Sequence, residues 1–168
     1  SLAASMGQGL LVWLAVQEKN RGKSVDEVFD WVEKSKWNIC HQFTVDYLDF
    51  LKRGGRISGL SAALGGALAI KPVLHVDNEG HLINVRKVRG RKASLKALVE
   101  RMENTAFKDI PQTVFISHGD CLAEAESVAA MVRESFPDAV ISINTIGPVI
   151  GAHTGPNVVA LFYQGEPR

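Results

Sequence analysis

This chain of 168 residues contains few cysteines and no pattern typical of a metal site. Cys40 and Cys121 lie far apart, without Cys-x-x-Cys or Cys/His spacing, and are interpreted as reduced thiols of a cytoplasmic protein. The five histidines show no metal-ligand spacing. Neither a metal nor a cofactor is therefore expected.

Long apolar runs and an excess of charge are also lacking. No stretch approaches the roughly 20 apolar residues of a membrane helix, and the apolar start lacks the basic residues and cleavage site of a signal peptide. Nineteen Lys and Arg against eighteen Asp and Glu give a net charge of +1, which argues against a protein whose main task is to hold nucleic acid. The hydrophobic content of 46% is sufficient for one substantial core.

Two helices are predicted at the start of the chain. Residues 1–19 carry apolar side chains on nearly every face, which indicates a buried helix. Ser5 and Gly9 share one face of it, where a ligand could approach closely, although helix packing is the favoured interpretation. Ser24-Val-Asp-Glu27 has the capping-box spacing that begins a second helix. This second helix is expected to lie on the surface, with one buried side formed by Val25, Val28, Phe29 and Val32.

A strand and a short helix are predicted next. Residues 39–45 alternate loosely, as in a strand, and Thr44 is expected to cap the helix that follows. Gly54-Gly55 should end that helix. Its inward-facing residues are predicted to be Tyr47, Leu48 and Leu51.

The remainder predicts a hairpin and a βαβ unit. Strands 70–76 and 82–88 flank Asp77-Asn-Glu-Gly80, a hairpin signal, and Pro72 suggests an edge strand or the beginning of a strand. Residues 113–116 and 139–143 should be parallel strands joined by a helix that Asp120 caps. An amphipathic helix and a last strand, 158–163, complete the pattern. The apolar face of the amphipathic helix is formed by Leu95, Leu98, Val99 and Met102.

These elements define an α/β fold with a mixed sheet of five or six strands. The chain begins without Met, and no strand precedes its first helix. We therefore expect residues 39–168 to form an α/β lobe. Residues 1–38 are expected to brace, or to belong to, an N-terminal lobe that is missing from this sequence.

Two glycine-rich stretches suggest a binding site. In Leu51-Lys-Arg-Gly-Gly-Arg-Ile-Ser-Gly-Leu60, the guanidinium groups of Arg53 and Arg56 could match a carboxylate or a phosphate. They could equally form surface salt bridges and help to cap the preceding helix. Residues 58–69 form a predicted helix of small residues that suits either helix packing, which is favoured, or an acyl chain.

The second stretch is Ile146-Gly-Pro-Val-Ile-Gly-Ala-His-Thr-Gly-Pro156. It is predicted to be a tight loop in which His153 and Thr154 offer donors to an acidic headgroup at the mouth of an apolar slot. No nucleophile elbow, phosphate-binding loop or dinucleotide fingerprint accompanies it. A phosphotransferase or hydrolase that uses His153 or His118 stays open as an alternative.

A basic run, Arg86-Lys-Val-Arg-Gly-Arg-Lys92, is the densest positive patch of the chain. Such a run is usually a solvated face. Because no aromatic residues are interleaved with it, a negatively charged protein or a phosphate is a better partner than nucleic acid. A third hypothesis is therefore an interaction domain that uses Arg86, Arg89 and Arg91.

Taken together, these motifs resemble the DegV family of bacterial fatty-acid-binding proteins over essentially the whole chain. The resemblance is carried by the opening Ser1-Leu-Ala-Ala-Ser-Met-Gly-Gln-Gly9, by Phe43 to Ser58, by Ile70-Lys-Pro72, by Arg89-Gly-Arg-Lys-Ala93 and by Ile146 to Pro156. Asn157 departs from the usual glycine, and Asn tolerates left-handed backbone better than most residues.

The resemblance implies the C-terminal lobe of a two-lobe cytoplasmic protein that encloses a long-chain fatty acid. Such a protein presents the carboxylate to a separate ATP-dependent fatty acid kinase, which makes the acyl phosphate, and is not itself an enzyme. We predict that the fatty acid contacts His153, Thr154, Ser5, Ile57, Leu64 and Ile150. The residues predicted to contact the kinase or the phosphate are Arg53, Arg56, Arg86, Arg89 and Arg91.

Overall fold

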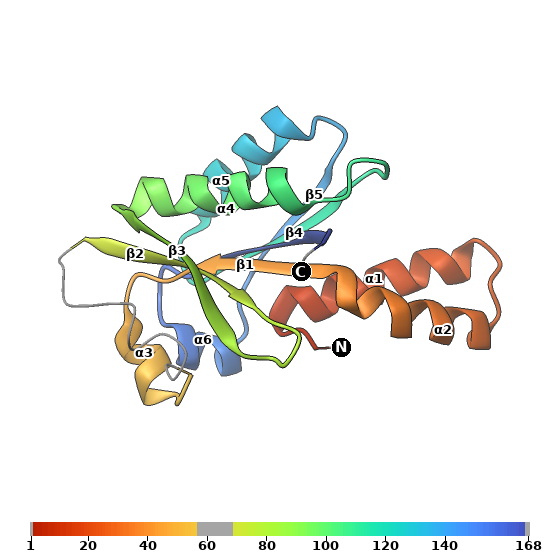
Figure 1. Ribbon diagram of the computed structural model, residues 1–168, viewed down its shortest axis with the longest axis horizontal. Coiled ribbons are helices and arrows are strands. Elements are labelled where there is room, and N and C mark those ends of the chain that lie inside the picture. Colours follow the sequence, from red (N-terminus) through yellow and green to blue (C-terminus); the bar gives the residue numbers. More distant parts are fainter. Residues whose placement is uncertain (1, 57–68, 167–168) are drawn as a thin grey trace.

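The computed structural model describes residues 2–56 and 69–166, which form a six-stranded mixed sheet with helices on both faces (Figure 1). The strands lie in the order β3-β2-β1-β6-β4-β5, and only β4 and β5 pair in parallel. The predicted α/β class, hairpin and βαβ unit are therefore confirmed. The strands are β1 (Ile39–Thr44), β2 (Ile70–Val76), β3 (Leu82–Arg89), β4 (Thr113–His118), β5 (Val140–Thr145) and β6 (Val159–Gln164).

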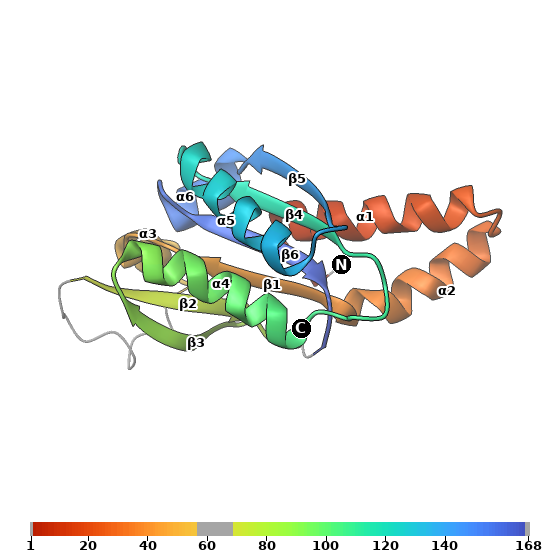
Figure 2. The same cartoon turned by 90° about the horizontal axis from the view of Figure 1, so that it is seen from above.

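The helices divide between the two faces of the sheet (Figures 1 and 2). Helices α4 and α5 lie side by side over one face, whereas α1, α3 and α6 lie on the other, and α2 packs against α1. A short 3-10 turn, Lys36–Asn38, follows α2. The helices are α1 (Ser5–Asn20), α2 (Val25–Ser35), α3 (Leu48–Arg53), α4 (Arg91–Thr105), α5 (Leu122–Ser135) and α6 (Pro148–Thr154).

Strand alternation creates a separate core on each face of the sheet. In β6, Val159, Leu161 and Tyr163 face α4 and α5, while Ala160 and Phe162 face α1. This follows from the two-residue period of a strand, which turns successive side chains to opposite faces. Both faces of β6 are apolar because helices cover both.

Helix α2 begins as predicted but is not buried as predicted. The Ser24 hydroxyl accepts from the Glu27 backbone N–H at 3.3 Å, and the Ser24 N–H donates to Glu27 Oε2 at 2.8 Å, which confirms the capping box. The expected buried side is only partly right: Val28 and Val32 are half-buried, whereas Val25 and Phe29 are 85% and 63% exposed. The helix projects with α1 beyond the sheet and packs against α1, so no strand covers Val25 and Phe29 (Figure 1).

Two predicted caps are wrong. Thr44 is the last residue of β1 and fully buried, so it cannot cap α3, which follows Tyr47 without a side-chain cap. Tyr47 is half exposed instead of facing inward, whereas Leu51 is buried as expected. Helix α5 follows Cys121, one residue beyond Asp120, so Asp120 does not cap it. Gly54 does end α3.

The hairpin of β2 and β3 decides between the two positions predicted for Pro72, in favour of the beginning of a strand. Strand β2 lies between β3 and β1, so Pro72 is not on an edge strand. Within β2, however, only Leu74 and His75 pair with β1. Pro72 lies near the beginning of β2, where β3 alone is its partner. A proline without an N–H is tolerated there because one side of the strand needs no ladder hydrogen bond.

Most of the predicted helix 58–69 lies outside the described residues. The predicted boundary between residues 1–38 and the lobe of residues 39–168 stays a prediction. Within residues 2–56 and 69–166, no helix combines the length and the apolar character needed to cross a membrane.

Candidate functional site

The two glycine-rich stretches meet in space, because α3 contacts α6. A Cβ at Gly54 would lie 2.1 Å from Nδ1 of His153, and a Cβ at Gly155 would lie 2.4 Å from Cδ2 of Phe50. Any larger residue would force these neighbours to move. The two glycines therefore allow the close approach of α3 and α6 that the sequence predicted for these stretches.

A cavity of about 480 Å³ lies beside this contact, on the α1 side of the sheet. Strands β1 and β6, the start of α1, and helices α3 and α6 all contribute to its wall. Most of the lining is apolar, and includes Phe43, Leu51, Ile150, Val158, Ala160 and Phe162. The polar side chains that reach it are Ser5, His41, Arg56, Ser117, His153 and Thr154.

His153 and Thr154 lie in the helix α6, where the sequence predicted a tight loop. Pro148 occupies the first turn of this helix, a position that needs no backbone N–H. The Thr154 hydroxyl donates to the Ile150 carbonyl at 3.0 Å, so its proton is used within the helix. The Nδ1 atom of His153 is buried and has no hydrogen-bond partner among the described residues. Of the two residues predicted to bind the headgroup, Thr154 already uses its hydroxyl proton in a hydrogen bond within α6. His153 therefore has the polar atom that is better placed to bind a ligand.

A polar pair lies on the wall near the start of α1. The Ser5 hydroxyl donates to the Ser117 hydroxyl at 3.4 Å, and Ser117 is fully buried. His41, which is 2% exposed, meets the ring of Phe162 edge-on at 5.8 Å. Sequence reasoning identified Ser5 but missed Ser117 and His41. The two-residue period of a strand indicates which residues share a face with each of them, but only the pairing of β1 and β4 with β6 brings them to the cavity.

The predicted arginines fall into different environments. Arg56 lines the cavity and donates from Nη1 to the Gly54 carbonyl at 2.6 Å, which agrees with a role in ending α3. The Arg53 guanidinium lies 6.0 Å from the centre of the Phe50 ring and does not line the cavity. Arg86 pairs with Glu100 at 2.5 Å.

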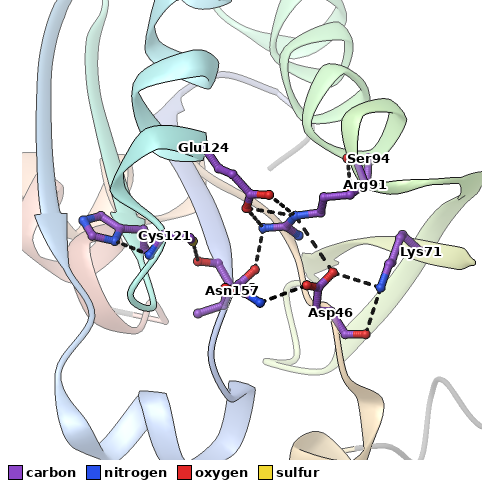
Figure 3. A network of polar contacts seen from close by, with 9 residues as sticks. Asp46, Lys71, Arg91, Ser94, Cys121, Glu124 and Asn157 are labelled. Atoms are coloured by element: carbon purple, nitrogen blue, oxygen red, sulfur yellow. Dashed lines mark hydrogen bonds and ion pairs between the residues drawn. The ribbon is translucent and has the colours of Figure 1, made fainter.

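The basic run does not form one uniform surface. Arg89 is exposed. The side chain of Arg91 is only 16% exposed and is held by Glu124, Asp46 and the carbonyl of Asn157 (Figure 3). Arg91 therefore belongs to the interior of the fold. Ile57 and Leu64 lie outside the described residues.

His118 does not join the cavity. It is 5% exposed, and its Nδ1 accepts from the backbone N–H of Cys121 at 3.2 Å, next to the start of α5. This contact satisfies the backbone N–H of the residue that immediately precedes α5. Burial, followed by the charge of Glu124, raises the pKa of the neighbouring Cys121 thiol. A raised pKa keeps the thiol protonated at neutral pH and argues against a reactive nucleophile.

The chain is an α/β protein with a mainly apolar cavity on one face of its sheet. Comparison with known proteins identifies its family. A family model described as "Uncharacterised protein, DegV family" matches residues 1–166. A DegV domain-containing protein of Clostridium perfringens is 51% identical over 166 residues, which are 99% of this chain and 57% of that protein. The chain belongs to the DegV family.

Solved structures agree with this assignment. A fatty acid binding DegV family protein of Streptococcus agalactiae is 30% identical, with a TM-score of 0.82 over 95% of this chain and 56% of that one. A DegV family protein of Thermus thermophilus, described by its fatty acid binding, is 29% identical, with a TM-score of 0.84 over 98% and 59%. The chain thus spans between half and two thirds of the length of these relatives.

Proposed function

We propose that this chain is part of a carrier that binds a long-chain fatty acid in the cavity between the sheet, α3 and α6. The observation that carries the proposal is a mainly apolar cavity wall with a few polar side chains, including His153 and Arg56. Two relatives with the same fold are described as fatty acid binding. The apolar wall would take the acyl chain, and the polar groups would orient the carboxylate.

The size and lining of the cavity support this assignment. Ligand sites typically enclose about 300–1,000 Å³ and combine an apolar lining with few polar groups, and the cavity of about 480 Å³ falls within that range. Each methylene that leaves water contributes about 0.8 kcal/mol, so the acyl chain would supply most of the affinity. The guanidinium of Arg56 and a ring nitrogen of His153 would orient the fatty acid, since both can donate a hydrogen bond to its carboxylate.

The proposal extends to a partner. A separate ATP-dependent fatty acid kinase would phosphorylate the carboxylate, and this chain would carry the substrate without catalysing the reaction. Arg53 and Arg89 are exposed and therefore suit contact with an acidic kinase surface or with the transferred phosphate. Arg91 does not suit this role, because its charge is already paired with Glu124 within the fold.

Extraction of the purified chain and mass spectrometry of the extract test the ligand. We expect a long-chain fatty acid in the extract, and saturable binding of oleate or palmitate to the delipidated chain. His153→Ala should weaken that binding, while Ala130→Leu, on the exposed side of α5, should not. A folded chain that yields no acyl chain and binds neither acid would refute the proposal.

A second assay separates a carrier from an enzyme. The oleate-loaded chain with Mg-ATP alone should form no acyl phosphate, and addition of a bacterial fatty acid kinase should produce it. Arg89→Glu should slow that step without changing oleate binding, whereas Arg133→Glu, an exposed charge on α5, should change neither. Turnover of ATP by the chain alone would support the phosphotransferase alternative instead.

A further inference from the structure

A cluster of charged and polar side chains lies outside the cavity and connects the segments that carry the cavity helices (Figure 3). We call it the anchor cluster, and it comprises Asp46, Lys71, Arg91, Glu124 and Asn157. Asp46 lies between β1 and α3, and Asn157 lies between α6 and β6. The cluster therefore joins the chain segment before α3 to the chain segment after α6.

Asp46 is the centre of the anchor cluster. Its Oδ2 accepts from the side-chain amide of Asn157 at 3.0 Å. The ammonium group of Lys71 lies 2.9 Å from its Oδ1 and also donates to its backbone carbonyl at 3.1 Å. These contacts fix both the side chain and the backbone of Asp46.

Arg91 connects Asn157 to the opposite helical layer. Its Nε donates to both carboxylate oxygens of Glu124, at 3.1 and 3.0 Å, and its Nη2 donates to the Asn157 carbonyl at 2.5 Å. Arg91 and Glu124 both lie in the first turns of long helices, α4 and α5. A planar guanidinium held through both Nε and Nη2 is a rigid connection, because its donors have a fixed geometry.

We propose that Asp46 and Asn157 are positioning residues for ligand binding. Their hydrogen bond, held by Lys71 and Arg91, sets how far α6 lies from α3, and thereby places His153 at the cavity wall. The inference rests on the proposed function, because it concerns the same ligand. It adds that residues which do not line the cavity determine how well the cavity holds a carboxylate.

Asn157→Gly is the sharpest test, because it removes the amide and little else. Asn157 has φ of 62°, which glycine adopts without strain, and its backbone N–H bond to the Gly119 carbonyl at 2.7 Å is retained. We expect oleate to bind about tenfold more weakly, as expected for the loss of one hydrogen bond to a charged group. The melting temperature should fall by a few degrees, no more than in Asp46→Asn. In the ligand-free chain, the NMR signals of the His153 imidazole should shift.

Two further variants separate positioning from general stability. Asp46→Asn keeps an acceptor for Asn157 but removes the charge opposite Lys71 and Arg91, so it should lower the melting temperature while oleate affinity stays close to wild type. Glu100→Gln removes the ion pair with Arg86, which belongs to a different part of the surface, and should leave both the imidazole signals and the affinity unchanged.

The outcomes separate the two proposals. Unshifted imidazole signals in Asn157→Gly, or wild-type oleate affinity in that variant, would overturn the positioning role even though the wild-type chain binds oleate. An Asp46→Asn variant that loses oleate binding in proportion to its stability would overturn it too. A wild-type chain that binds no fatty acid, but whose imidazole signals still respond to Asn157→Gly, would overturn the proposed ligand and leave the placement of His153 by the anchor cluster intact.

Discussion

Gly54 lies directly against the imidazole of His153, and a Cβ at position 54 would lie 2.1 Å from Nδ1. Gly54 has φ of −76°, which any residue can adopt. Glycine is therefore needed at this position for space, not for backbone conformation. The contact joins the end of α3 to a side chain that lines the cavity.

Gly54→Ala is expected to weaken fatty acid binding with little loss of stability. The methyl group would displace the ring of His153, and a side-chain ring can rotate away at small cost. Oleate affinity should fall several-fold, as measured by titration of the delipidated chain, while the melting temperature stays near that of the wild type.

The matched control is Gly151→Ala in α6, where a Cβ would meet Ile146 at an ordinary 3.7 Å. Alanine also favours the helix relative to glycine. This variant should bind oleate like the wild type. Equal affinity of the Gly54→Ala variant and the wild type would show that the position of His153 does not matter to the ligand.

Gly155→Ala should instead destabilise the fold. Gly155 has φ of 75° and ψ of −178°, a region that is essentially restricted to glycine, and its Cβ would lie 2.4 Å from the Phe50 ring. Strain of this kind costs about 1–3 kcal/mol. We expect the free energy of unfolding, measured in urea, to fall by about 2 kcal/mol or more.

Gly9→Ala provides the comparison for that measurement. Gly9 lies within α1, and a Cβ there would be 3.9 Å from Phe115, an ordinary contact. Alanine should therefore be neutral or stabilise the helix by about 0.5–1 kcal/mol. A Gly155→Ala variant as stable as Gly9→Ala would contradict the strain argument.

The features that were predictable from sequence are those set by neighbouring residues. The Ser24 capping box, the hairpin at Gly80 and the end of α3 at Gly54 all depend on a few consecutive residues, and all were found. Thr44 and Asp120 were wrongly predicted as caps because a residue able to cap a helix can also end a strand or a turn. Local sequence does not decide between these uses.

Parts of the candidate site required information that no local pattern contains. The register of β6 pairs His41 with Phe162 and Ser117 with Ala160, which brings two buried polar residues to the cavity wall. That register joins segments more than forty residues apart in the chain. The exposure of Val25 and Phe29 likewise depends on α2 having no sheet beneath it.

Asp46 should make stability depend on pH in the acid range. Burial alone would raise the pKa of Asp46, but the hydrogen bond from Lys71 and the charge of Arg91 outweigh it and hold the pKa below its ordinary value of 3.8. The charged form therefore stabilises the folded state. Its contribution is complete above pH 3.8 and is lost as pH falls through the lower pKa of the folded protein.

Asp46→Asn tests this dependence. At pH 7 the variant should be less stable by about 1.5 kcal/mol, the contribution of a hydrogen bond to a charged group. The difference from the wild type should shrink below pH 3.8, because the wild-type carboxyl then becomes neutral too. Urea unfolding of both proteins at a series of pH values from 7 downwards measures this difference in the free energy of unfolding. A difference that stays constant with pH would contradict the assigned role of the carboxylate.

Ala160→Leu should shorten the acyl chain that the cavity accepts. Ala160 lies on β6, is 6% exposed and lines the cavity on the same strand face as Phe162. Leucine adds three carbon atoms that would occupy part of the cavity. Each methylene of the acyl chain that is excluded from the cavity costs about 0.8 kcal/mol of binding free energy. Stearic acid should therefore lose more than tenfold in affinity, whereas decanoic acid should lose little. The control is Ala130→Leu, exposed on α5, which should bind both acids as the wild type does. An equal loss of affinity for both acids in Ala160→Leu would mean that the acyl chain does not reach Ala160.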